Sequence, residues 1–104
     1  MKLKPEELER VAGFFRAFSE PTRLALLQEL KGGPKNVGEL VEATDTSQAN
    51  VSKHLKLLHE AGLLDRRREG NLAIYSIAEP AVMELCKLAC ERLNTRPKTR
   101  KLSF

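Results

Sequence analysis

A run of amide, hydroxyl and ammonium side chains between residues 47 and 56 has the chemistry needed to read the edges of DNA bases. Amides can pair with adenine, ammonium groups can reach guanine or phosphate, and a small methyl group can touch the methyl of thymine. A solvated surface helix without a ligand is the alternative, although it would be expected to carry more carboxylates than Glu60 alone. The candidate DNA-binding residues of this run are Ser47, Gln48, Ala49, Asn50, Ser52, Lys53 and Lys56.

A helix is needed to place these side chains on one face, and the surrounding residues predict one. The hydroxyls at 46–47 can cap its first free backbone N–H groups, and Gly62 ends it where a left-handed residue is commonly needed. At about 100° per residue, Val51, Leu55 and Leu58 fall within roughly 60° of one another and form a stripe that would be buried. The polar run then faces solvent.

The residues before this helix predict a second helix packed close to it. Asn36 followed by Glu39 resembles a capping box, and only Asp45 and Thr46 connect this shorter helix to the next one. So short a connection is typical of a helix-turn-helix, whose second helix lies in a DNA groove. The helices expected ahead of the polar run cover residues 5–18, 21–31 and 37–44.

After Gly62 the hydrophobic pattern changes from helical to alternating, which predicts a β-hairpin. Two strands, residues 64–69 and 72–77, flank the turn pair Gly70 and Asn71. Such a hairpin forms a wing, in which Arg66 and Arg68 share one face and Arg67 takes the other. These arginines could meet a duplex backbone or minor groove. Alternatively, they only block the addition of another strand at the sheet edge.

The last predicted helix, residues 80–94, is too apolar to be covered by the core of one small domain. Its apolar side chains spread over roughly 220° of the helix circumference. A second copy of the chain is the natural cover, which predicts a two-fold homodimer that uses this helix and the first one. The residues expected at the interface are Leu8, Val11, Phe15, Val82, Leu85, Ala89 and Leu93.

Cys86 and Cys90 lie four residues apart on this last helix, so both thiols lie along the same edge of its apolar arc. They either pack as small apolar groups or sense an inducer. Two thiolates are too few for a tetrahedral zinc site. We therefore expect thiol modification or a thiophilic metal, and Lys87 and Arg92 could lower a thiol pKa.

No other metal site or cofactor is predicted from the sequence. His54 borders the buried stripe and is expected to be structural, and neither it nor His59 has an obvious second ligand at metal spacing. An enzyme is disfavoured, because the sequence shows no nucleophile with a candidate base and no phosphate-binding glycine loop.

The length and charge of the chain indicate one domain followed by a basic tail. The 104 residues suit a single core, which we place in residues 1–94. The net charge of +4 arises from the last 13 residues, which hold five basic and no acidic side chains, so residues 95–104 are expected to be a basic, disordered tail. No apolar run is long enough to span a membrane, and we expect a cytoplasmic protein.

Three segments together resemble the ArsR-type bacterial repressors over residues 11–93. They are SEPTRLALLQEL, VGELVEATDTSQANVSKHLKLLHEAGLL and RRREGNLAIYSI, in the order and spacing of that family. The resemblance implies a mainly helical winged helix-turn-helix with a small β-hairpin. It also implies a homodimer that binds double-stranded DNA at an inverted-repeat operator and is released by an inducer.

Residue by residue, the resemblance places Gln48, Ala49, Ser52 and Lys53 where family members touch DNA. Ala49 departs from the serine often found there, and Asn71 stands where a basic wing residue is common. The cysteines of the third helix and the histidines of the last helix, which hold metals in many relatives, are missing. A winged helix that binds another protein instead of DNA is the alternative, and the exposed lysines argue against it.

Overall fold

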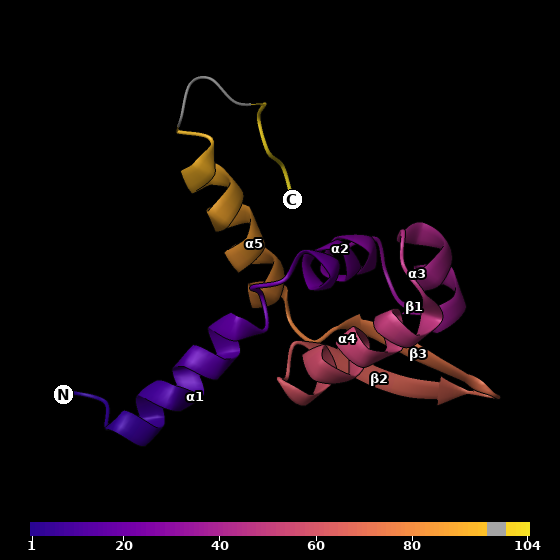
Figure 1. The fold of residues 1–104 in the computed structure, drawn as a ribbon, viewed down its shortest axis with the longest axis horizontal. Helices are drawn as coiled ribbons and strands as arrows, with labels where there is room; N and C mark the ends of the chain where they lie inside the picture. Colours follow the sequence, from indigo (N-terminus) through magenta and orange to yellow (C-terminus); the bar gives the residue numbers. More distant parts are fainter. Residues whose placement is uncertain (96–99) are drawn as a thin grey trace.

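The computed structural model describes residues 1–95 and 100–104 and confirms the predicted mainly helical, winged helix-turn-helix fold (Figure 1). Helices α2, α3 and α4 pack over a small sheet, whereas α1 and α5 extend away from that body. Among the described residues, no helix is both long and apolar enough to cross a membrane. In chain order the elements are α1 (Pro5–Arg16), α2 (Pro21–Leu30), β1 (Lys35–Asn36), α3 (Val37–Ala43), α4 (Gln48–Glu60), β2 (Leu64–Glu69), β3 (Leu72–Ile77) and α5 (Pro80–Leu93).

The core lies where α2, α3 and α4 meet above the start of the hairpin. The stripe predicted on α4, Val51, Leu55 and Leu58, is fully buried there. It packs in one cluster with Leu27 of α2 and Leu40 of α3. Burying a leucine side chain of this kind contributes roughly 1.5–3 kcal/mol, so these few residues stabilise much of the body.

Capping groups fix the ends of the two helices of the helix-turn-helix. The side chain of Asn36 accepts from the backbone N–H of Glu39 at 2.8 Å, and the Glu39 carboxylate accepts from the N–H of Asn36 at 2.9 Å. Ser47 Oγ accepts from the N–H of Asn50 at 3.1 Å. Gly62 follows α4 with φ of +83°, a conformation that other residues rarely adopt. The predicted caps are therefore confirmed.

The hairpin has the predicted strands and turn, and the structure adds a third strand. β2 and β3 pair antiparallel from Leu64 opposite Ile77 to Glu69 opposite Leu72. The short β1 pairs with the other side of β3, which gives the strand order β1-β3-β2. Two residues are too few to show an alternating pattern, so β1 was not predicted. It joins the start of α3 to the wing.

Helices α1 and α5 leave much apolar surface uncovered in the single chain. No residue of α1 is buried, and α5 buries only Val82 and Cys86. α1 ends at Arg16, two residues before the predicted end, and the buried Ala17 follows it. The exposed large apolar side chains of the two helices are Leu8, Val11, Phe14, Phe15, Leu88 and Leu93.

Part of the predicted disordered tail, residues 96–99, lies outside the described residues. Beyond it, the backbone of Leu102 exchanges two hydrogen bonds of 2.6 Å with the side-chain amide of Asn94. Phe104 is partly buried against the core cluster. Leu102 and Phe104 therefore contact the folded domain.

Candidate nucleic-acid interface

The polar run of α4 lies on the face of the helix opposite its buried stripe. Six of its seven candidate residues are exposed to solvent: Ser47, Gln48, Ala49, Ser52, Lys53 and Lys56. Val51, Leu55 and Leu58 hold the other side of the helix in the core, so the exposed face cannot rotate inward without losing that burial. The body thus presents amide, hydroxyl and ammonium groups on a fixed helix.

Ser47 and Asn50 take part in the turn that begins this helix. Ser47 is the N-cap, and its hydroxyl accepts the N–H of Asn50. The Asn50 side chain is half-buried, and its Nδ2 donates to Thr46 Oγ1 at 3.0 Å. Both side chains therefore brace the first turn, which fixes the direction in which Gln48 and Ala49 point.

The three arginines of the wing lie in different local environments. Arg66 stands opposite Tyr75, and its guanidinium carbon lies 6.0 Å from the centre of that ring. Arg67 forms an exposed ion pair of 2.8 Å with Glu69. Exposed pairs of this kind contribute little, so a phosphate could replace the carboxylate. In residues 1–95 and 100–104, no ion pair is found for Arg68, which shares the face of Arg66.

The tip of the wing is a tight turn that leaves its side chains in solvent. Gly70 has φ of +60°, which the turn between β2 and β3 requires. Asn71 is exposed beside it and is uncharged. A phosphate contact at the tip would therefore be a hydrogen bond from this amide and not an ion pair.

Both histidines of α4 are held by contacts inside the chain. His54 is only 7% exposed, and it lies between Glu20 and Arg23. Burial lowers its pKa, Glu20 raises it, and Arg23 and Lys53 lower it further. The structural role predicted for His54 is confirmed, whereas no sequence pattern singled out its two partners. His59 donates from Nδ1 to the Leu64 carbonyl at 2.9 Å.

The two thiols open into different hollows of the surface. Cys86 is buried and lines an apolar cavity of about 220 Å³ between α1, α2 and α5. Burial, and then the neighbouring Cys90, raise the pKa of Cys86. Lys87, which the sequence offered as a group that could lower a thiol pKa, does not offset this rise at Cys86, and its Nζ atom lies 3.9 Å from Glu84 Oε1. The half-buried Cys90 lines a hollow of about 300 Å³ with Phe104 and neighbouring residues.

No metal cluster forms among the residues that the structure describes. In residues 1–95 and 100–104, no three His, Cys, Asp or Glu side chains gather closely enough to hold a metal ion. Any metal bound by this part of the chain would therefore have fewer than three such ligands from one copy. That condition leaves the pair Cys86 and Cys90 as a two-ligand candidate.

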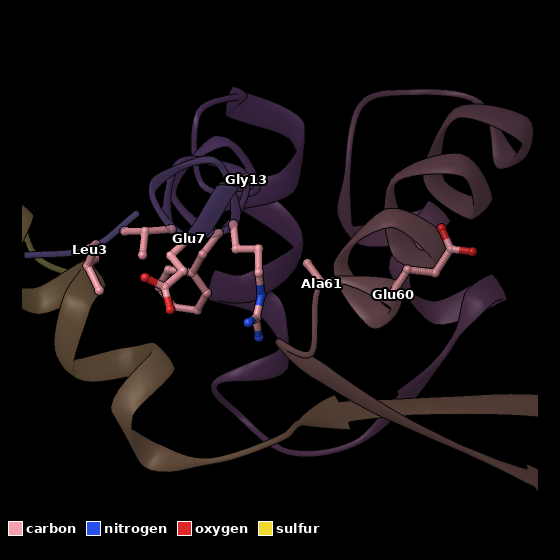
Figure 2. Close-up of a pocket in the computed structure, with 8 residues that line it drawn as sticks. Leu3, Glu7, Gly13, Glu60 and Ala61 are labelled. Atoms are coloured by element: carbon pink, nitrogen blue, oxygen red, sulfur yellow. The ribbon is translucent and has the colours of Figure 1, made fainter. Parts of the chain in front are cut away.

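An open groove of about 730 Å³ separates α1 from the end of α4 (Figure 2). Leu3 and Glu7 lie on one side of it and Ala61 on the other, while the Glu60 carboxylate points away from them. Its lining is apolar and carboxylate side chains with one guanidinium, Arg10, and contains no cysteine, serine or histidine.

A tight two-helix unit with an exposed polar second helix, followed by an arginine-bearing hairpin, defines a winged helix-turn-helix DNA-binding protein. The comparisons with known proteins give the family. Residues 20–66 match the family described as "Bacterial regulatory protein, arsR family". The chain belongs to this family and is a DNA-binding transcriptional regulator.

Three similar proteins illustrate how far the likeness extends. A "Probable mercury resistance operon repressor" of Streptomyces lividans is 42% identical over 78% of this chain and 65% of its own length. An uncharacterized HTH-type transcriptional regulator of Methanocaldococcus jannaschii, MJ1325, is 36% identical over 83% of this chain and 98% of its own. The solution structure of the homodimeric winged helix-turn-helix domain Mb0332 from Mycobacterium bovis superposes with a TM-score of 0.76, at 30% identity, over 89% of this chain and 90% of that one.

Proposed function

We propose that the chain is a homodimeric repressor that binds an inverted-repeat operator through α4 and the wing and leaves it when an inducer binds. The observation that carries this proposal is the polar face of α4, exposed on a helix whose opposite side is fully buried. A rigid helix with amides and lysines in its first half matches the shape and donor pattern of the major groove.

In this proposal each exposed group of α4 and the wing has a defined role. Gln48 reads an adenine through its amide, while Lys53 and Lys56 reach guanine or phosphate. Arg66 and Arg68 meet the DNA backbone from one face of the wing. The Ala49 methyl touches a thymine methyl, and Asn50 and Ser52 take part in reading the bases. The remaining contacts, from Ser47, Arg67 and Asn71, orient the helix or touch the sugar-phosphate chain.

The homodimer is supported by the uncovered apolar faces of α1 and α5. Phe15 is 56% exposed and Leu93 is 55% exposed, and other large apolar side chains of the same helices are exposed as well. Single exposed apolar residues are common, but several on the same helices mark an interaction surface. A two-fold pairing of these helices would cover both faces at once. Val82 is only 3% exposed and packs in the chain's own core, so it contributes little to such an interface.

The inducer that we propose is a thiophilic metal ion, with mercury(II) as the first to test. The support is the pair Cys86 and Cys90 on successive turns of α5, together with the name of the Streptomyces lividans relative. One Hg²⁺ would bind two thiolate sulfurs, and the two thiol protons would leave to solvent. Burial raises the pKa of Cys86 and so lowers its thiolate fraction for metal binding and for oxidation alike. Thiol modification is therefore the second candidate to test, and the name of the relative is what places the metal first.

Binding of the full chain to its upstream intergenic DNA tests this proposal. Fluorescence anisotropy should show tight, salt-dependent binding by a dimer, and added Hg²⁺ should release the DNA. The double variant Cys86→Ser/Cys90→Ser should keep the DNA affinity and lose the response. A double variant that still responds to Hg²⁺, arsenite or a persulfide donor as the wild type does would show that the thiols only pack.

The sequence alone also allows a protein-binding winged helix without DNA affinity, and variants of the reading face of α4 test that interpretation directly. It predicts that Gln48→Ala and Lys56→Ala leave the affinity for DNA unchanged. Loss of affinity in either variant, with the fold intact by circular dichroism, would eliminate it.

A further inference from the structure

The guanidinium of Arg23 joins α1, α2 and α4 at one point. Its Nε donates to the Ala17 carbonyl at 2.9 Å, and its Nη2 donates to the Arg16 carbonyl at 2.9 Å. These are carbonyls at the C-terminal end of α1, which lack partners within the helix and carry its partial negative charge. The Nη1 atom of the same side chain lies 3.1 Å from Nδ1 of His54, in the middle of α4.

The roles of the His54 nitrogens follow from this contact. Because arginine can only donate, Nδ1 must accept, and the ring proton lies on Nε2. Nε2 is 3.1 Å from Glu20 Oε2, while Glu20 Oε1 accepts the backbone N–H of Thr22 at the start of α2. The Nε2 contact is poorly aligned for a hydrogen bond, and Glu20 Oε2 is buried with no better partner among the described residues. Of the two polar contacts of the His54 ring, the one to Arg23 is therefore the well-formed hydrogen bond.

Within the single chain, α1 is held to the body at its C-terminal end. None of its residues is buried, and it extends from the body beyond the point where it joins α2 (Figure 1). The first buried residue, Ala17, directly follows the helix, and it is one of the two whose carbonyls Arg23 binds. Besides the apolar packing of Ala17 and Phe18 in the core cluster, α1 is attached to the reading helix α4 by a polar link through the guanidinium of Arg23 and the ring of His54.

We propose that Arg23 is a positioning residue that fixes the angle between α1 and α4 and so sets the separation of the two reading helices in the dimer. This inference rests on the homodimer of the proposed function, in which α1 carries part of the interface. Arg23 would then control which spacing of DNA half-sites the protein accepts, acting through the groups of its own chain that its guanidinium binds. Lysine could not replace it, because one ammonium cannot hold two carbonyls and a ring nitrogen in this planar arrangement.

The test measures how binding depends on half-site spacing. The full chain binds a duplex with the inverted repeat of its upstream DNA at the native spacing, duplexes with one or two base pairs added or removed, and a single half-site. We expect Arg23→Gln to bind the native spacing 10-fold to 100-fold more weakly and the single half-site less than 3-fold more weakly. Its preference among the spacings should be lost. Arg16→Gln is the matched control, because it removes the same charge from the exposed end of α1 and should keep the preference.

Other outcomes separate this inference from the proposed function. An equal loss on full site and half-site, or an unchanged spacing profile, would overturn the role of Arg23. A monomeric wild type in light scattering would instead overturn the dimer.

Should Arg23→Gln unfold, Arg23→Lys is measured in its place. Spin labels at Lys56→Cys, in the Cys86→Ser/Cys90→Ser background, then report the distance between the two reading helices of the dimer. A distance distribution in the Arg23→Lys variant as narrow as the one with Arg23 present would contradict the proposal.

Discussion

The helix-turn-helix body and the two outer helices, α1 and α5, differ in how much of their apolar surface is buried within one chain. The body buries its leucines against one another within a single chain, as Leu26, Leu27 and Leu58 show. The outer helices instead leave phenylalanine and leucine side chains in solvent. The body is therefore stabilised by packing within one chain, whereas the apolar faces of the outer helices would be buried only by a partner. Stability and DNA binding should respond differently to changes in the two regions.

The largest expected effect separates the two regions by stability. Leu55→Ala in the body leaves a cavity in a fully buried cluster and should lower the free energy of unfolding by about 2–5 kcal/mol. Leu88→Ala on the exposed face of α5 should cost less than about 1 kcal/mol when the protein is dilute enough to be monomeric. Urea unfolding followed by circular dichroism measures both. Equal losses would show that the outer helices already belong to the core.

The next change breaks the outer region without touching the body. Ala89→Glu places a charge on the exposed apolar side of α5 and should yield folded monomers that bind operator DNA at least about 10-fold more weakly. Lys87→Glu, on the polar side of the same helix, should remain dimeric. Light scattering and anisotropy report the two properties. If Ala89→Glu stays dimeric at micromolar concentration, the interface lies elsewhere.

Two changes on the reading face test the body's own contribution to binding. Gln48→Ala should cost about 1–3 kcal/mol at one base position and relax the preference there. Lys56→Ala should weaken binding to all sequences alike and reduce the salt slope by about 1. Titrations against single-base variants of the operator at several salt concentrations distinguish the two. Neither variant should change the oligomeric state.

The smallest effect concerns His54, where the body meets α1. Its pKa is lowered in the folded chain, so the unfolded chain binds more protons once the pH falls below the ordinary value of about 6.5. Stability from this group is present above that pH and decreases as the pH falls toward the folded pKa. The charged groups facing the ring are Glu20, Arg23 and Lys53. His54→Gln should flatten the pH dependence of urea unfolding between pH 7.5 and 5.5, and an unchanged slope would assign the effect to other groups.

Features set by neighbouring residues could be predicted from the sequence. The capping box of Asn36 and Glu39, the cap at Ser47 and the positive φ of Gly62 each depend on local chemistry, and all are present. The exposure of α1 and α5 also follows from the width of their apolar arcs. The solvent-facing side of α4 likewise follows from the position of its apolar residues around the helix axis.

Features that join distant residues could not be predicted in this way. Arg23 and His54 are 31 positions apart, and nothing in the local pattern of either marks the contact. β1 exists only because Lys35 and Asn36 meet β3 nearly forty residues later. The raised pKa of Cys86 could not be predicted, because charges nearby in sequence are visible in the sequence, whereas burial is a property of the folded chain.

The absence of buried residues in α1 also links its folding to protein concentration. A helix of 12 residues is marginal in water without tertiary support, so in a dilute chain α1 should fray and exchange its amide protons quickly. Association would then supply the missing support by mass action, and the protection of α1 should rise with concentration while that of α4 stays constant. At low concentration in the cell, the first helix would be open to proteases, so the protein would be degraded faster. At high concentration, association would protect the helix and extend the lifetime of the protein.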